Sequence, residues 1–288
     1  MWAMLGSFRR AVWKSISHDT FTIAKAAAYS AILSVFPALL VGTTLLAISP
    51  RTEGLRGEIH QAFDQLLPAD TMTLVQDYFQ DRHALTAKIL WSAAFVSLLA
   101  AMDVMLSLLE GFRLAYDLPQ DLWGFWKTRM IALALIPVCI LPLACATVLI
   151  AFGREIEAWM IGMSDHELRG YVVFAWRMGR WGLGLLTVVT VLSTIYHFGT
   201  PRTQHWGKAL PGAVLATITW FLATLLYGGY VTRSAQYTVV YGSLAAGVAT
   251  LVWLYLASLS VLFGAEFNAQ MYPKDEIAVR SSDGPRPE

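Results

Sequence analysis

The feature that most constrains this chain is a series of long apolar stretches that carry almost no charge. The first, AAAYSAILSVFPALLVGTTLLAI, occupies residues 26–48. As a helix, its 23 residues rise about 34 Å, which is enough to cross a hydrocarbon core of about 30 Å. Five similar stretches follow, at about 89–109, 130–151, 175–197, 211–231 and 243–267. The sequence therefore predicts an all-α, polytopic integral membrane protein with six transmembrane helices.

The composition agrees with a lipid environment. Of the 288 residues, 56% are hydrophobic and only 14% are charged, whereas a soluble domain usually carries about 25% charged residues. A water-soluble core could not hide this much apolar surface, but lipid can solvate it, so membrane lipids are predicted partners. The net charge of +1 comes without a basic stripe, which predicts that the protein does not bind nucleic acid.

Three polar segments flank or interrupt the membrane domain, which we place at 26–271. Residues 1–25 are predicted to be an amphipathic lead-in that lies in the headgroup layer or is simply solvated. Its apolar residues recur at helical spacing: Leu5, Phe8, Val12 and Ile16. The segment 49–86 has its own helical periodicity and predicts short amphipathic surface helices. The tail 272–288 is polar and predicted to be disordered.

The distribution of basic residues predicts the orientation. If the N-terminus is cytoplasmic, the cytoplasmic segments hold 12 Lys and Arg, against nine in the segments on the opposite side. Much of the opposite set lies in longer loops, where basic residues count for less. We therefore expect both termini in the cytoplasm.

Two acidic residues, Asp103 and Glu266, fall inside predicted spans. Each costs about 2.5–3.5 kcal/mol at the centre of a helix, so each needs a partner or a wet cavity. Ser92, Asp103 and Glu110 lie within about 20° of one another around a helix, and we expect this face to point into the bundle. Tyr255 and Glu266 are also eleven residues apart and share a face.

Two interpretations of these polar residues stay open. The functional one is a polar pocket or path that opens to the cytoplasm. The structural one makes Glu266 an anchor at the membrane edge, paired with Arg113 or Lys127. The candidate path residues are Tyr29, Asp103, Arg113, Tyr255 and Glu266.

Small residues predict close helix packing at two places. Gly242 and Ala246, like Ser243 and Gly247, are four residues apart at the start of the sixth span. Three glycines begin the fourth span: Gly179, Gly182 and Gly184. Such spacing lets two helix backbones approach each other.

Catalytic and metal-binding motifs are missing from the sequence. It contains no HExxH zinc motif, no GxSxG nucleophile elbow, no P-loop and no dinucleotide fingerprint after a strand. The Asp165-His166-Glu167 run is better explained as a solvated loop than as a metal site. We therefore predict no catalytic residues, no cofactor and no metal, and we expect that the protein is not an enzyme.

Three segments make the sequence similar to a known family. They are AAAYSAILSVFPALL at 26–40, GFRLAYDLP and FWKTRMIAL within 111–133, and YGSLAAGVATLVWLYLASLSVLFGAEFNAQ at 241–270. Together they resemble the YihY/BrkB family of bacterial inner-membrane proteins from about Asp19 to Met271. The combination of Tyr-Gly-Ser-Leu and Gly-Ala-Glu-Phe-Asn in the last span is the more specific part. The family usually has Leu where this chain has Phe267.

The resemblance implies a six-span protein of the bacterial inner membrane with both termini in the cytoplasm. Family members have carried the label ribonuclease BN, but the HxHxDH run of zinc-dependent RNA-processing hydrolases is absent here. Relatives point instead to the cell envelope and to export or flipping of lipid-like molecules. Three hypotheses follow: a transporter of a lipid-like or small envelope-related molecule, a non-transporting envelope scaffold or assembly factor, and an enzyme such as a ribonuclease.

Overall fold

The structure is a computed structural model, and it describes residues 2–48, 87–119, 123–163, 169–200, 205–233 and 244–272. The predicted surface helices of 49–86 lie outside the described residues, as does the predicted disordered tail from 273 onward.

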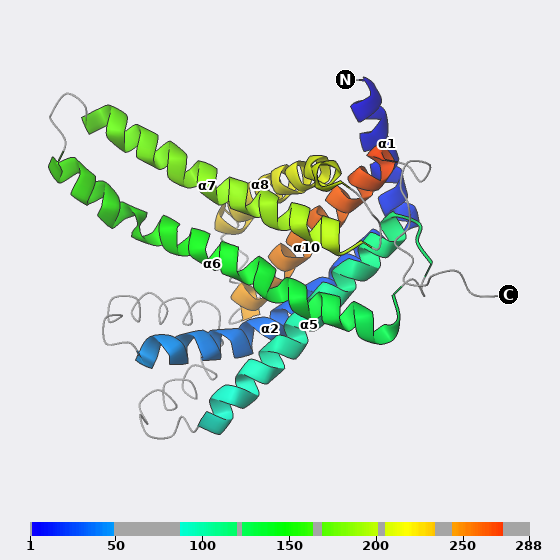
Figure 1. Ribbon diagram of the computed structural model, residues 1–288, viewed down its shortest axis with the longest axis horizontal. Helices are drawn as coiled ribbons and strands as arrows, with labels where there is room; N and C mark the ends of the chain where they lie inside the picture. The colour runs from blue at the N-terminus through cyan, green and yellow to red at the C-terminus, as the bar shows by residue number, and fades with distance from the viewer. Residues whose placement is uncertain are drawn as a thin grey trace. The chain divides into compact units, whose positions relative to one another are not determined.

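Every regular element in the described ranges is helical (Figure 1). The α-helices are α1 (Trp2–Ser17), α2 (Thr20–Ile48), α5 (Ala87–Ala115), α6 (Phe125–Met163), α7 (Arg169–Phe198), α8 (Leu210–Arg233) and α10 (Ala245–Met271). A single 3-10 turn, η2 (Trp206–Lys208), precedes α8. The all-α prediction is confirmed.

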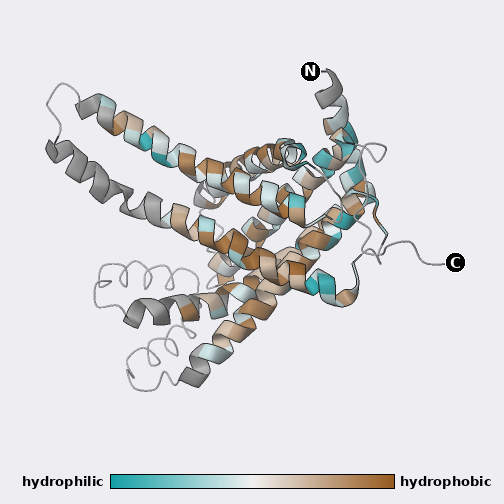
Figure 2. Cartoon of the chain, viewed as in Figure 1, coloured by the Kyte–Doolittle hydropathy of each residue, from teal (hydrophilic) through white to brown (hydrophobic). Residues whose placement is uncertain are grey.

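Five helical segments are long and apolar enough to cross a membrane: Trp91–Ala115, Phe125–Thr147, Val173–Phe198, Trp206–Val231 and Ala245–Met271. Within α2, Thr20–Val35 forms a shorter apolar segment. The Phe125–Thr147 segment is strongly apolar, yet few of its residues are buried inside the protein. In Figure 2, hydrophobic residues recur along the coloured parts of the long helices. Since water would not tolerate this exposed apolar surface, the chain is a multi-pass membrane protein.

Two helices continue past the ends of the predicted spans. The third span was predicted to end near 151, but α6 continues as a helix through Met163. We also expected the second span to end near 109, but α5 continues to Ala115 and includes Glu110 and Arg113. In both cases a helix extends past its apolar stretch. Hydropathy does not determine where a helix ends, because the last carbonyl groups can be satisfied by water or by capping groups.

The chain divides into two compact units, and three helices contribute a segment to each. The first unit holds residues 1–20, 109–219 and 260–288, and therefore α1, α6, α7 and the adjoining ends of α5, α8 and α10. Its core is formed by large side chains with no more than 2% of their surface exposed: Phe112, Tyr116, Tyr196 and Leu262. The rings of Phe112 and Tyr196 pack edge to face, with 5.3 Å between their centroids.

The second unit holds residues 21–108 and 220–259. Its segments of α8 and α10 are joined by two side-chain hydrogen bonds. The Tyr227 hydroxyl donates to the carbonyl of Ala249 over 3.2 Å, and the Trp253 indole N–H donates to the Thr224 hydroxyl over 3.2 Å. Polar groups within apolar helices gain such partners because the surrounding hydrocarbon offers none.

The first helix, α1, buries small residues and leaves several large apolar residues exposed. Ser7, Ala11 and Ser15 lie on one face and are buried. Phe8, Val12, Trp13 and Ile16 are all exposed. This is the pattern of a helix whose apolar face meets lipid. The predicted amphipathic lead-in is therefore helical, and its place in the headgroup layer stays a prediction.

The predicted small-residue contacts are wrong where the structure tests them. A Cβ added at Gly179, Gly182 or Gly247 would meet no atom within 4 Å. Close approach occurs instead at Gly212 and Gly264, where an added Cβ would collide with a neighbouring helix. Spacing alone could not distinguish the two groups, since a small residue also suits a lipid-facing surface.

Candidate functional site

The second half of α10 is the most buried stretch of any helix in the described chain, and it contains the Gly-Ala-Glu-Phe-Asn sequence. Each residue from Gly264 to Ala269 is buried. The side chain of Asn268 is fully buried, accepts a 2.7 Å hydrogen bond from the backbone N–H of Gly212 and donates to the carbonyl of Ala209 over 3.0 Å. It thereby satisfies one of the free N–H groups at the start of α8.

Gly264 allows α10 to approach α8 and α7 closely. A Cβ at this position would lie 2.5 Å from the carbonyl oxygen of Gly212 and 2.7 Å from the Cβ of Ala216, nearer than real Cβ atoms come. It would also collide with the hydroxyl of Tyr196, which donates a 2.6 Å hydrogen bond to the carbonyl of Val261. The glycine is therefore required by contact and not by backbone conformation.

Glu266 is the buried acidic residue of this segment, with 1% of its side chain exposed. Its Oε1 lies 2.7 Å from Nδ1 of His18, in the turn between α1 and α2. Its second oxygen, Oε2, is buried and has no hydrogen-bond partner among the residues that the structure describes. A buried carboxylate is costly unless it is paired and hydrogen-bonded, so His18 is what makes this position tolerable.

The imidazole of His18 connects Glu266 to two more exposed charges. Its Nε2 lies 3.3 Å from Oδ1 of Asp117 and 3.3 Å from Nζ of Lys14. Lys14 and Asp117 are themselves 3.7 Å apart. These four residues, Lys14, His18, Asp117 and Glu266, form what we call the histidine cluster, which runs from a buried carboxylate to an exposed one.

Asp117 stands at a position where glycine would be easier. It follows the end of α5 with a φ of 50°, in the left-handed region. Its N–H bonds the carbonyl of Leu114, and the next N–H, of Leu118, bonds that of Arg113, as in a Schellman C-cap. An aspartate in this conformation is uncommon, although it is tolerated better than most residues. Its carboxylate provides what glycine could not, a partner for His18 and Lys14.

The histidine cluster offers two protonation arrangements. A charged imidazolium donates from both ring nitrogens, to Glu266 and to Asp117. A neutral ring that donates from Nδ1 to Glu266 accepts at Nε2 from the ammonium of Lys14. The imidazole of His18 can therefore carry one proton or two while it contacts Glu266 on one side and Lys14 and Asp117 on the other.

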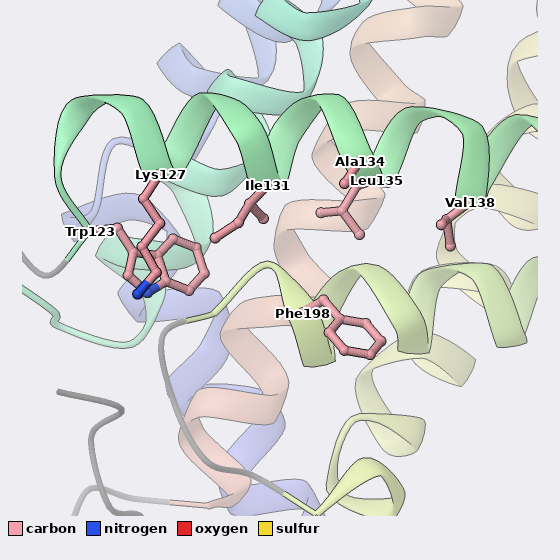
Figure 3. Close-up of a pocket in the computed structure, with 7 residues that line it drawn as sticks. All are labelled: Trp123, Lys127, Ile131, Ala134, Leu135, Val138 and Phe198. Carbon is pink, nitrogen blue, oxygen red and sulfur yellow. The ribbon is translucent and has the colours of Figure 1, made fainter. Parts of the chain in front are cut away.

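A groove lies between α6 and α7 in the same unit, with a volume of about 470 Å³ (Figure 3). Its lining residues are Trp123, Lys127, Ile131, Ala134, Leu135, Val138 and Phe198. In Figure 3, Trp123 and Lys127 lie together at one end, while the ring of Phe198 reaches into the groove from α7. The groove is apolar apart from the ammonium group of Lys127 and the indole N–H of Trp123.

The predicted pairing of Glu266 with Arg113 or Lys127 is wrong. Arg113 forms a two-pronged ion pair with Glu110, one turn away on α5, and donates to the carbonyl of Leu118 over 3.0 Å. A guanidinium finds a carboxylate on its own helix at i,i+3 spacing without any help from tertiary structure. Glu266 pairs instead with His18, in the turn between α1 and α2.

The other three predicted path residues belong to the second unit. Tyr29 is 62% exposed, Tyr255 is half-buried, and Asp103 is exposed. The expectation that the face of Ser92, Asp103 and Glu110 points inward is not met, since all three are exposed. A single path through all five predicted residues stays a prediction.

Sequence reasoning missed His18, Asp117 and Asn268. His18 precedes the first apolar stretch and Asp117 follows the second, so a search for polar residues inside spans passes over both. Asn268 lies two residues beyond Glu266 in the recognised Gly-Ala-Glu-Phe-Asn motif. Its position in that motif could have identified it as a candidate residue. Across the described ranges, no group of three His, Cys, Asp or Glu residues is arranged to hold a metal ion.

Comparison with known proteins places the chain among bacterial membrane proteins. It is 29% identical over 255 residues to a Bacillus subtilis protein named ribonuclease-like protein YfkH, covering 87% of this chain and 89% of the relative. It is 26% identical to a UPF0761 membrane protein of Tolumonas auensis, covering 90% of this chain and 83% of that one. A UPF0761 membrane protein of Alteromonas mediterranea is 23% identical, with coverages of 90% and 85%. No solved structure matches the chain.

A family model described as virulence factor BrkB matches residues 12–287, nearly the whole sequence. That match includes the buried half of α10, the histidine cluster and the groove between α6 and α7. The resemblance first seen in three segments is confirmed: the chain belongs to the virulence factor BrkB family.

Proposed function

We propose that this protein resides in the bacterial inner membrane and moves a lipid-like envelope molecule across or within the bilayer. The observation that carries the proposal is the histidine cluster. It joins the buried carboxylate of Glu266 to the exposed Asp117 and Lys14 through one imidazole. Ionisable residues inside membrane spans are rare and are found mainly along substrate or proton pathways.

The proposal includes a topology of six spans with both termini in the cytoplasm. The whole of α2, Thr20–Ile48, has 29 residues and rises about 43 Å, enough to cross the bilayer although it contains Pro37. Six crossings bring both ends to one side, and the excess of Lys and Arg favours the cytoplasmic side. Reporter fusions after residue 272 and within 164–168 should give opposite readouts, and a periplasmic tail would contradict the topology.

Movement of lipid is tested in liposomes that contain the purified full-length chain and a fluorescent phospholipid, with dithionite added outside. Wild-type protein should expose inner-leaflet lipid to quenching faster than empty liposomes do. Glu266→Gln keeps the shape of the side chain and removes its charge, and we expect at least a tenfold slower rate. Asp117→Asn removes the exposed end of the cluster and should slow the rate in the same direction.

Glu110→Gln is the matched control, because Glu110 is an exposed carboxylate on α5 whose partner is Arg113 and not the histidine cluster. It should move lipid at the wild-type rate. If wild-type and empty liposomes behave alike, the transport proposal fails and the envelope scaffold becomes the better explanation. The name of the Bacillus relative makes ribonuclease activity the other alternative, so the same preparation should also be incubated with structured RNA.

A further inference from the structure

The groove between α6 and α7 has the length of one lipid leaflet. Lys127 and Val138 mark its two ends along α6 and are eleven residues apart. At 1.5 Å per residue this is about 16 Å, and half of a 30 Å hydrocarbon core is about 15 Å. A chain that lies against Ile131, Leu135 and Phe198 would therefore run from the headgroup level to the middle of the bilayer.

The polar end of the groove has the chemistry of the membrane interface. Trp123 and Lys127 line it together (Figure 3), and tryptophan and lysine are typical of the headgroup level. Lys127 is exposed and makes no ion pair within the described part of the chain. The nearby Arg129 lies over the ring of Phe125 at 3.5 Å and is occupied there. One ammonium group is thus available at the end of an apolar groove.

Within the described residues, the first turn of α6 contains no acidic residue that would balance this cation. The positive end of a helix favours acidic side chains and disfavours basic ones. A phosphate from outside the chain would relieve this imbalance, and Lys127 is placed to hold it.

We infer that the groove binds one anionic phospholipid, with an acyl chain along α6 and its phosphate at Lys127. With the segment between α5 and α6 on the cytoplasmic side, the lipid comes from the cytoplasmic leaflet, where anionic lipids supply the matching charge. The volume of about 470 Å³ falls in the range of ligand pockets. This inference concerns binding, and it holds whether or not the bound lipid is the one that the protein moves.

Native mass spectrometry of the full-length chain in detergent tests the inference by titration with dioleoylphosphatidylglycerol or dioleoylphosphatidylcholine. The two probes share their acyl chains and differ in net charge. For the first bound lipid, we expect wild-type protein to prefer phosphatidylglycerol by about fivefold. Lys127→Gln should remove that preference. Lys25→Gln is the matched control, since it removes an exposed lysine outside the groove, and it should keep the preference.

A second pair of variants tests the apolar part. Ala134→Trp fills the groove, whereas Ala144→Trp adds the same ring to an exposed position of α6 outside it. We expect Ala134→Trp to lose the first bound lipid of either kind and Ala144→Trp to retain it. The inference is overturned if Lys127→Gln keeps the preference, or if Ala134→Trp binds as wild-type protein does. It is equally overturned if excess glycerol phosphate, which has no acyl chain, displaces the bound lipid. A dimer mass that Ala134→Trp abolishes would also overturn it, because a second copy of the chain would then fill the groove.

Discussion

The two halves of α10 differ in a way that reverses the rule for soluble proteins. The first half, Ala245 to Leu259, is almost wholly apolar, yet every one of its residues is at least partly exposed. The second half holds Glu266, Asn268 and Gly264, and eight of its residues are buried. In water, the apolar half would be the core.

The difference shows which interactions organise this fold. Lipid solvates apolar side chains as well as protein does, so burying them gains little, and polar or close-packing residues decide where helices meet. Glu266 finds His18, Asn268 holds the start of α8, and Gly264 permits the close approach. The four predictions below test this contrast, from the largest expected effect to the smallest.

Gly264→Leu should prevent folding, whereas Gly247→Leu in the first half of the same helix should not. The added side chain at Gly264 would collide with the backbone of Gly212, which cannot move aside as a flexible side chain would. At Gly247 it would enter open space. The measurement is the yield of monodisperse protein by fluorescence-detected size exclusion. Equal yields from both variants would remove the contrast between the two halves.

His18→Ala should destabilise the protein by about 3–5 kcal/mol, because it leaves Glu266 buried without its partner. The double variant His18→Leu with Glu266→Leu removes both polar groups and should recover most of that loss. At the exposed end of the cluster, Asp117→Asn should cost no more than about 1 kcal/mol. Unfolding in mixed micelles compares the three. If the double variant is no more stable than His18→Ala, the pair stabilises the fold by more than the cost of burying its own polar groups.

Asn268→Ala should cost about 1–3 kcal/mol, since it leaves the N–H of Gly212 and the carbonyl of Ala209 without their side-chain partner. Asn268→Asp keeps the oxygen that accepts from the N–H of Gly212 but loses the N–H that donates to the carbonyl of Ala209. Its loss of unfolding free energy therefore reports on the bond to Ala209 and on the added charge. Thr250→Ala in the first half is the control, because its hydroxyl bonds the carbonyl of Ala246 within the same helix and no other helix among the described residues. If Thr250→Ala costs as much as Asn268→Ala, the contacts between helices are not what stabilises the second half.

The sequence predicted what depends on hydropathy, and it failed where the outcome depends on which helices meet. The predicted apolar stretches overlap the five segments that are long and apolar enough to cross a membrane and the shorter apolar segment of α2, because lipid solvation depends on composition along the chain. Glu266 was correctly recognised as an acid that needs a partner, but its partner came from a residue outside the apolar stretches, His18. Gly247 and Gly264 are both glycines in one span, and only the packing of the helices tells them apart.

The smallest effect on stability is expected at Asp103, an acidic residue of α5 in the second unit that is exposed where Glu266 is buried. Asp103 is exposed at the midpoint of Trp91–Ala115, and the nearby Ser107 hydroxyl bonds its backbone carbonyl and not its carboxylate. Asp103→Asn should therefore change the unfolding free energy by less than about 0.5 kcal/mol. An exposed carboxylate at that depth is costly against lipid, so we expect its surroundings to be wet. After replacement of Cys139 and Cys145, a cysteine placed by Asp103→Cys should react with a charged, membrane-impermeant thiol reagent.

Leu98→Cys provides the control for this last test, because Leu98 is also exposed but lies about 140° around the helix and only about 7.5 Å away along it. A lipid-facing thiol at that position should stay unlabelled. Labelling of the Asp103→Cys variant alone would identify a water-filled surface on one side of α5, as a transport path requires. In that case Asp103→Asn should slow lipid movement without loss of folded protein. If neither cysteine reacts, Asp103 faces an apolar environment, and it would lose its place among the candidate path residues even though Glu266 and the histidine cluster keep theirs.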